Sequence, residues 1–320
     1  MVLSGHTDVV PVSGQAWDSN PFAARIADGR IYGRGSCDMK GFIATALTQA
    51  PRFARARLKR PVHFAFTYDE EIGCFGAPVM LAELTRNGPK TAVAIVGEPT
   101  GMRIIEGHKS GYKFTTEFAG LEGHASQPDR GVNAIEYAVR YITHLLELAN
   151  AARKQPGDDA FDPPWTTVNV GQIEGGIARN VIPKSCNVEW EIRSVTSSQA
   201  DAMLDSINDY AASELLPLMR KVHPEADIIN RVVSAVGPFE RMPESEAVAL
   251  VAALTGSNAA GVVSLSTEAG LFQAAGIQAV VCGPGHIEQA HRPNEFVERT
   301  QLGACLSMLD GLVDKLSGPT

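Results

Sequence analysis

The stretch that decides the fold is VHFAFTYDEE, residues 62–71. Its first seven residues are mostly apolar or aromatic, which indicates a strand, and the chain turns acidic where the strand ends. Two further apolar runs, at residues 91–96 and 278–282, are separated from it by stretches with helical character. Short apolar strands that alternate with helices are typical of a mostly parallel, doubly wound α/β sheet. We therefore expect that sheet here.

Helices and one β-hairpin are expected around these strands. The hairpin covers residues 24–32 and turns at Asp28-Gly29, a sequence that favours a tight turn. The predicted helices are residues 41–50, 77–85, 244–254, 268–275 and 299–316.

The pattern changes between about residues 109 and 236. Here the predicted order is strand, helix, strand, strand, helix, strand, which is the βαββαβ order of a ferredoxin-like domain. The six elements are residues 112–118, 133–151, 166–172, 187–194, 198–219 and 227–234. We therefore predict two domains, one from residues 1–108 and 237–320, and one inserted between them from residues 109–236.

Composition limits the classes of partner. The chain has 320 residues, of which 28 are basic and 36 acidic, and its net charge of -8 argues against nucleic acid or an anionic membrane as the main partner. Its five cysteines are scattered and include no CxxC pair, which favours a reducing compartment over a disulfide framework. The sequence shows neither a membrane-spanning apolar stretch nor a signal peptide. We expect a cytoplasmic protein.

The first residues offer little apolar sequence for a strand. Only Met1, Val2 and Leu3 precede the polar run 4–8, whereas a strand usually has about five or six residues. We expect a short edge strand, with His6 beside a frayed end and with N-terminal strands missing.

Acidic and imidazole side chains follow several of the strand-like runs. These residues are His6, Glu70, Glu71, Glu98 and His291. Ligands of open α/β sheets bind at the carboxyl edge of the strands, where such residues would meet. Asp38 lies in a glycine-flanked loop, GRGSCDMKG, residues 33–41. Imidazoles and carboxylates together would suit divalent metals of borderline softness.

Each of these residues also has an ordinary interpretation. A single histidine after a strand is often simply solvated, and Asp38 could cap the helix that follows it. Glu98 precedes a proline turn. Glu70 and Glu71 must differ in role if they end a strand, because consecutive strand side chains point to opposite faces.

The ordered set of motifs resembles the M20 family of metallopeptidases and deacylases, from residue 4 to about residue 315. The motifs are GHTD (5–8), DMKG (38–41), DEEIG (69–73), GEPT (97–100) and AH (290–291). The resemblance implies two divalent ions, Zn²⁺ or Co²⁺, with Asp38 bridging them through a loop whose Asp38–Met39 peptide bond is cis. The implied metal ligands are His6, Asp38, Glu71, Glu98 and His291. Glu70 is then the general base and Asp8 orients His6, whereas His286 is not expected to be a ligand.

The inserted domain also carries a motif of the family, GLEGHAS at residues 120–126. The resemblance implies a dimerisation or lid domain whose His124 reaches the active site of the partner subunit in a homodimer. Asn180 and Arg193 match the family's binders of the substrate carboxylate, which suits a guanidinium fork. Without the resemblance, His124 would be an exposed loop histidine and Arg193 would pair with an acidic neighbour on its strand.

The segments SLSTEAGLF (264–272), VCGPG (281–285) and QAHRPNEF (289–296) most resemble the branch of the family that deacetylates N-acetylornithine. This implies hydrolysis of that amide to ornithine and acetate, as in arginine biosynthesis. Glu268 would then recognise the cationic amine of the substrate, although it could equally be a helix N-terminal charge. The alternatives are another acyl-amino-acid hydrolase, such as a succinyl-diaminopimelate desuccinylase, an aminoacylase or a dipeptidase, and a truncated, catalytically silent homologue.

Overall fold

The computed structural model describes residues 1–88 and 91–317, which fold into two compact units. The first unit contains Met1–His108, Phe239–Val263 and the chain from Thr267 onward. The second unit contains Lys109–Pro238 together with Ser264–Ser266. Residues 318–320 of the predicted range 237–320 lie outside the described residues.

The first unit is built on a sheet to which the described residues contribute six strands, in the order β13-β6-β14-β5-β1-β4. Strands β4, β1, β5 and β14 run parallel to one another, while β6 is antiparallel to β14. The mostly parallel sheet is as predicted. Its strands are β1 (Val2–His6), β4 (His63–Thr67), β5 (Val93–Val96), β6 (Ile104–His108), β13 (Ala260–Val263) and β14 (Gln278–Val281).

The prediction that the start of the chain forms an edge strand is wrong. Strand β1 spans Val2–His6, lies between β4 and β5, and is buried at all five residues. Polar residues can continue this strand because its backbone groups are paired on both sides and Ser4 Oγ donates to Glu268. His6 is therefore held by an internal strand and not by a frayed end.

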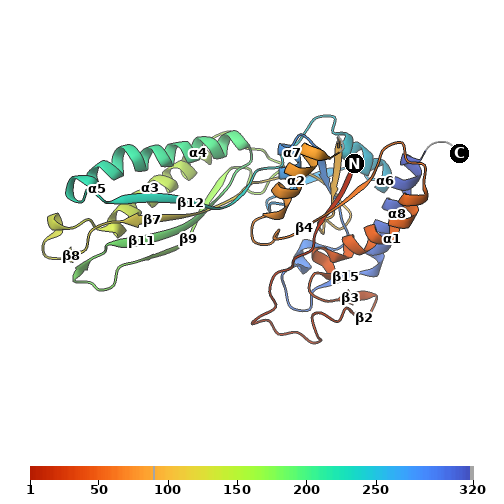
Figure 1. Ribbon diagram of the computed structural model, residues 1–320, viewed down its shortest axis with the longest axis horizontal. Coiled ribbons are helices and arrows are strands. Elements are labelled where there is room, and N and C mark those ends of the chain that lie inside the picture. Colours follow the sequence, from red (N-terminus) through yellow and green to blue (C-terminus); the bar gives the residue numbers. More distant parts are fainter. Residues whose placement is uncertain (89–90, 318–320) are drawn as a thin grey trace. The chain divides into compact units, whose positions relative to one another are not determined.

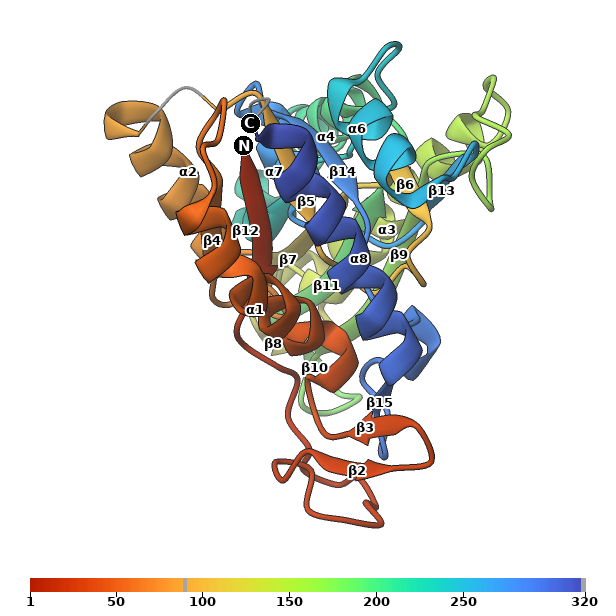
Figure 2. The same ribbon diagram turned by 90° about the vertical axis from the view of Figure 1, so that its right-hand side faces the viewer.

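Helices cover both faces of this sheet, and alternate strand residues point into the two layers. Leu3 and Ile95 pack against one helical layer, and Val2 and Val96 against the other. This is the doubly wound arrangement, and Figure 2 shows α1 and α8 side by side. The first layer is α1 (Gly41–Arg55), α6 (Glu246–Thr255) and α8 (Arg299–Leu316), and the second is α2 (Gly76–Asn87) and α7 (Ala269–Ala274).

A small antiparallel sheet ties an early segment of the chain to a late one. The predicted hairpin forms from β2 (Arg25–Ala27) and β3 (Arg30–Tyr32), and β15 (Phe296–Glu298) pairs with β3. This pairing brings the segment before β15 next to the turn η1 (Ser36–Lys40), which contains Asp38. A short helix, η4 (Ile287–Gln289), precedes that segment.

The second unit has the predicted βαββαβ order, with an antiparallel sheet of order β12-β7-β11-β9 among the described residues. Its helices pack on one face of this sheet around buried aromatic and aliphatic side chains (Figure 1). The predicted helix 198–219 is divided into α4, a π-helical turn η3 and α5. The main elements are β7 (Gly111–Ala119), α3 (Ala134–Ala152), β9 (Thr167–Gly175), β11 (Ser185–Arg193), α4 (Ser197–Tyr210), η3 (Ala211–Leu215), α5 (Leu216–Val222) and β12 (Asp227–Val236).

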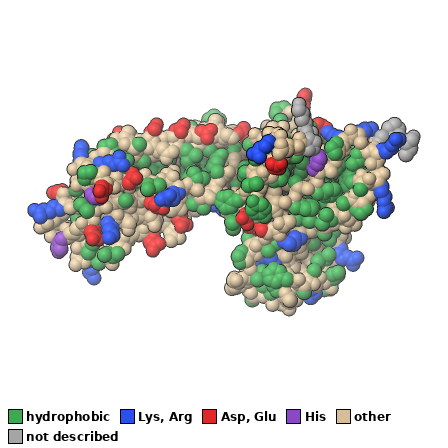
Figure 3. Space-filling model, in the orientation of Figure 1, with side chains coloured by type: hydrophobic (Ala, Val, Ile, Leu, Met, Phe, Trp, Pro, Cys, Tyr) green, Lys and Arg blue, Asp and Glu red, His purple; other side chains and the backbone are tan. Residues whose placement is uncertain are grey.

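Two minor strands and a short helix complete the second unit. Strand β8 (Gly123–His124) pairs with β10 (Val181–Ile182), and η2 (Pro128–Arg130) follows β8. On the face shown in Figure 3, acidic and basic side chains are interspersed over this unit. Within residues 1–88 and 91–317, none of the helices has the length and apolar character needed to cross a membrane.

Candidate metal centre

The end of β1 contributes to a first group of potential metal ligands. His6 Nε2 lies 3.0 Å from Asp38 Oδ1 and 3.9 Å from Glu98 Oε1. Asp38 comes from η1, and Glu98 follows β5 directly after Gly97. A Cβ at Gly97 would fall 2.0 Å from the Phe42 ring, so glycine lets α1 pack against the backbone beside Glu98. All three ligand side chains are buried.

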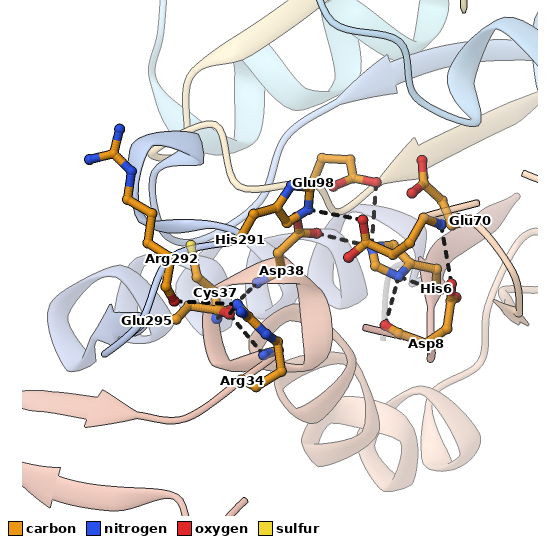
Figure 4. A network of polar contacts seen from close by, with 12 residues as sticks. His6, Asp8, Arg34, Cys37, Asp38, Glu70, Glu98, His291, Arg292 and Glu295 are labelled. Atoms are coloured by element: carbon orange, nitrogen blue, oxygen red, sulfur yellow. Dashed lines mark hydrogen bonds and ion pairs between the residues drawn. The ribbon is translucent and has the colours of Figure 1, made fainter. Parts of the chain in front are cut away.

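A second group shares Asp38 with the first. Asp38 Oδ2 lies 3.3 Å from His291 Nε2, which in turn lies 2.9 Å from Glu71 Oε2. The two oxygens of Asp38 thus face the two imidazoles, one each (Figure 4). The Asp38–Met39 peptide bond is cis, and no side chain caps the N-terminus of α1, which removes the capping role considered for Asp38.

Asp8 contacts both sides of the centre. Its backbone oxygen lies 3.1 Å from His6 Nδ1, and its Oδ1 lies 3.5 Å from the same nitrogen. Its Oδ2 accepts a hydrogen bond of 3.1 Å from the backbone N–H of Glu71. With its proton on Nδ1 facing Asp8, the His6 ring presents Nε2 to the centre.

Glu70 and Glu71 lie differently with respect to the two groups, but not for the reason that the sequence suggested. They lie in a turn after β4, not at the end of a strand, and Gly73 and Cys74 donate backbone hydrogen bonds to Glu70 O. Glu71 joins the second ligand group, whereas Glu70 belongs to neither group. Cys74 Sγ donates to Glu70 Oε1 over 3.4 Å. Burial, aided by the negative charges of Asp38 and Glu71, raises the pKa of Glu70 to about 7.

Burial and close charge pairs shift the other titrating groups. Burial alone would lower the pKa of His6, but the hydrogen bond to Asp38 and the charge of Glu98 raise it to about 11. Hydrogen bonds to Asp38 and Glu71 raise the pKa of His291 to about 10. Burial would raise the pKa of Asp38, yet the two imidazoles hold it below its usual range. Burial, reinforced by Asp38, lifts the pKa of Glu98 well above its ordinary value.

This donor set fits a pair of divalent cations. Each group offers an imidazole nitrogen and two carboxylate oxygens within 4.8 Å of one another, and Asp38 belongs to both. Glu71 Oε1 is buried and has no hydrogen-bond partner among the described residues, as expected of an oxygen that accepts a cation. Mixed nitrogen and oxygen ligands suit zinc and similar ions. His286 belongs to neither group in the described part of the chain.

The predicted site residues of the second unit have local partners. His124 Nδ1 lies 2.7 Å from Ser126 Oγ in an exposed turn, and the backbone oxygen of Asn180 accepts from Ala125. The Arg193 guanidinium forms a two-pronged ion pair with Glu191, with contacts of 3.2 and 3.1 Å. The strand-neighbour salt bridge considered for Arg193 is therefore present.

Glu268 lies in the first unit and is only 1% exposed. It is the N-cap residue of α7, but its side chain makes no capping hydrogen bond, and its Oε2 accepts from Ser4 Oγ at 3.4 Å. Its Oε1 has no hydrogen-bond partner within the described ranges. Burial raises the pKa of this carboxyl. In this conformation the side chain does not face solvent.

Three residues near the centre had no role in the sequence-based prediction. Cys74 donates to Glu70, and Arg34 and Glu295 form a buried ion pair beside Asp38. Arg34 stands in the loop 33–41 that contains Asp38, and Glu295 stands in the QAHRPNEF segment that supported the resemblance, so these two segments were the available signal. Their contact spans 261 positions and follows from the β3–β15 pairing, which the sequence did not reveal.

Two curated relatives match almost the whole chain, and both are named acetylornithine deacetylase. The protein from Photorhabdus laumondii is 33% identical over 314 residues, which cover 98% of this chain and 79% of the relative. The protein from Shigella sonnei is 35% identical over 298 residues, which cover 93% of this chain and 75% of the relative.

Solved structures support the same fold. Aminopeptidase PepT from Bacillus cereus is 20% identical, with a TM-score of 0.71 over 98% of this chain and 80% of its own. A dinuclear metal-binding peptidase of the M20 family from Bacillus subtilis is 19% identical, with a TM-score of 0.63 over 99% of this chain and 81% of its own. The model of peptidase family M20/M25/M40 matches residues 2–315. This chain, a hydrolase with two candidate ligand groups that share Asp38, therefore belongs to peptidase family M20/M25/M40.

Proposed function

We propose that the chain uses two divalent ions, Zn²⁺ or Co²⁺, to hydrolyse the amide bond of an N-acetylated amino acid, with N-acetylornithine as its substrate. The observation that carries the proposal is the shared position of Asp38 between two ligand groups, with a non-ligand carboxylate, Glu70, next to them. The two relatives named acetylornithine deacetylase support the choice of substrate. Products would be ornithine and acetate, which fits arginine biosynthesis.

The proposed ligands are His6, Asp38 and Glu98 for one ion and Asp38, Glu71 and His291 for the other. Two ions bound there would lower the pKa of a water molecule and polarise the acyl carbonyl.

Glu70 is the proposed general base. Its Oε atoms take a proton from the attacking water, whose oxygen forms a bond to the acyl carbon. The carbon–nitrogen bond then breaks, and Glu70 returns the proton to the leaving amine. Burial raises the pKa of Glu70, which makes its carboxylate a stronger base for the first transfer. Asp8 keeps His6 oriented throughout.

In the second unit, we propose that Asn180 and Arg193 bind the substrate carboxylate and that His124 stabilises the oxyanion in the partner subunit of a homodimer. The Arg193 fork would exchange Glu191 for the substrate carboxylate. His124 is exposed in the single chain, as a residue that acts in another subunit must be. His124→Ala should therefore lower turnover while the dimer persists, as measured by sedimentation.

For the substrate amine we propose Glu268, acting through its negative charge and not through direct contact, because its side chain is 1% exposed. The test is the Glu268→Gln variant. Its KM should rise for N-acetylornithine and stay unchanged for N-acetylmethionine, which has a neutral side chain. An equal change for both substrates would contradict the assignment.

We also propose the cytoplasm as the compartment, because the five cysteines are all free and buried. The function itself is tested by an assay of N-acetylornithine, succinyl-diaminopimelate, N-acetylmethionine and a dipeptide, with zinc and with cobalt. We expect the highest kcat/KM for N-acetylornithine. A higher kcat/KM for succinyl-diaminopimelate or for the dipeptide would show that the proposed substrate is wrong, while amide hydrolysis as the reaction would still stand. Hydrolysis of none of the four would contradict the proposed function.

A further inference from the structure

A buried ion pair lies beside the candidate metal centre without belonging to it. Arg34 Nη1 lies 2.6 Å from Glu295 Oε2, and both side chains are 1% exposed. Replacing a buried pair by apolar residues often costs no stability, so a pair of this kind is weak evidence for a purely stabilising role. The hydrogen bonds of this ion pair show which backbone segments it fixes in place.

The Glu295 carboxylate accepts hydrogen bonds from backbone N–H groups of the loop that contains Asp38. Its Oε2 accepts from Gly35 at 3.1 Å, and its Oε1 accepts from Cys37 at 2.9 Å and from Asp38 at 3.1 Å (Figure 4). Asp38 and Met39 have non-helical backbone angles, so this turn is not an ordinary start of α1. A single carboxylate thus fixes the backbone at and just before Asp38.

Arg34 holds the segment on the other side of the centre. Its Nη1 is 3.5 Å from the backbone oxygen of Arg292, and its Nη2 donates to Gln15 Oε1 at 2.6 Å. Gln15 Nε2 in turn donates to the backbone oxygen of His291 at 2.9 Å. The same pair is therefore linked to the backbone around both Asp38 and His291.

His291 needs such support more than an ordinary residue does. Its φ of 62° lies in the left-handed region, which a non-glycine residue adopts at a cost unless the surroundings impose it. His291 is also half exposed, so packing alone does not fix its ring. The bonds to its backbone oxygen and to Arg292 provide the constraint.

We propose that Glu295, held by Arg34, is a positioning residue that sets the geometry of Asp38 and His291 and thereby the affinity of the centre for its ions. This inference rests on the proposed metal-dependent function. Within the described part of the chain, the Glu295 carboxylate bonds only to Arg34 and to backbone groups, so its effect would reach the ions through the candidate ligands that it orients.

The test is a titration of the chelator-treated full chain with Co²⁺, followed by the visible absorption of the ion. Glu295→Gln keeps the shape of the side chain but puts an amide N–H₂ against N–H donors. Its Co²⁺ affinity should fall by about 10–100-fold, the effect usual for a residue that orients a metal ligand, and the absorption spectrum should change with it.

The matched control is Glu298→Gln, three residues along the chain. Glu298 also pairs with an arginine, Arg30 at 3.5 Å, but this pair is half exposed and lies on the β3–β15 sheet. Co²⁺ affinity of the control should stay within about twofold of the wild type. An unchanged affinity in Glu295→Gln, or equal losses in both variants, would overturn the inference, because a merely structural role affects unfolding and not the affinity of the folded protein.

Two more variants make the outcome decisive. If Glu295→Gln does not fold, Gln15→Ala takes its place: it removes one hydrogen bond to His291 O and should weaken Co²⁺ binding about fivefold, and no weakening would reject the proposal. Asp38→Asn separates this inference from the function on which it rests. Unimpaired Co²⁺ binding by Asp38→Asn would reject the metal centre itself. Loss of binding in Asp38→Asn with full binding in Glu295→Gln would leave the centre standing and reject the positioning role.

Discussion

Replacing Glu70 by glutamine should separate metal binding from catalysis. Glu70 is the half-buried carboxylate of the DEE turn that belongs to neither candidate ligand group. Glutamine has the same shape, and its amide oxygen can still accept the contact from Cys74 Sγ. The substitution therefore removes the ability to take a proton while it leaves the surroundings in place. We expect Glu70→Gln to fold and to bind both ions as the wild type does.

The expected loss of turnover follows from the role assigned to Glu70. A positioned general base contributes about 10²–10⁴-fold to the rate, which is about 3–5 kcal/mol of activation free energy. Burial raises the pKa of Glu70, which strengthens its carboxylate as a base, so the loss should lie within this range. Because Glu70 acts on the transition state, KM should change less than about threefold.

The assay is steady-state hydrolysis of N-acetylornithine, with the metal content of each preparation measured by elemental analysis. Glu83→Gln is the control, since Glu83 lies on α2 in the same unit with its side chain 61% exposed. Turnover of Glu70→Gln close to that of the wild type, at full metal content, would refute the base assignment. A loss of metal in parallel with turnover would instead make Glu70 a ligand.

Three further predictions concern stability and reactivity. Removal of the ions by a chelator should lower the thermal midpoint, since ions at a thousandfold excess over Kd stabilise the folded state by about 4 kcal/mol; an unchanged midpoint by calorimetry would contradict a metal centre. All five cysteines should resist an aromatic disulfide reagent at pH 8 in the native protein and react fully in denaturant. The reason is that burial raises the pKa of each thiol, that of Cys305 to about 11 and that of Cys282 to about 12. Fast labelling of the native protein would contradict this prediction. Leu309→Ala in the core should lower the free energy of unfolding by about 2–5 kcal/mol in urea titrations, whereas Leu146→Ala, at a side chain 47% exposed, should change it much less.

The apolar runs carried most of the information about the fold. The run at residues 62–68 became β4, and the predicted helix at residues 299–316 became α8 with the same bounds. Strand β6 was missed because its sequence, IIEGH, contains a charged residue and a histidine. In the structure His108 is buried and accepts hydrogen bonds from the backbone of Thr267 and Gly270, so a tertiary contact makes this strand possible.

The candidate centre was predictable as a set of residues and not as a geometry. The motifs named the candidate ligands that the structure brings together, but the strand-end geometry used to argue about Glu70 and Glu71 does not apply, because β4 ends at Thr67 and both residues lie in the turn after it. The start of the chain was misjudged for a related reason. Counting apolar residues in β1 ignores the hydrogen bonds that β4 and β5 supply on both sides. Whether a short segment such as β1 forms an internal strand depends on strands that are distant from it in the sequence.

The charge of the centre argues for cations independently of any motif. Six carboxylates lie in or beside it, against the imidazoles of His6 and His291 and the Lys40 ammonium: Asp8, Asp38, Glu70, Glu71, Glu98 and Glu268. Burying a carboxylate without a compensating partner costs several kcal/mol, and the raised pKa values of Glu70, Glu98 and Glu268 express that cost. Two divalent cations would bring twice the positive charge of two imidazolium groups, and they would leave the imidazoles free to act as neutral ligands. Divalent ions held by the two candidate ligand groups would thus account for an excess of buried acid that a stable protein would otherwise avoid.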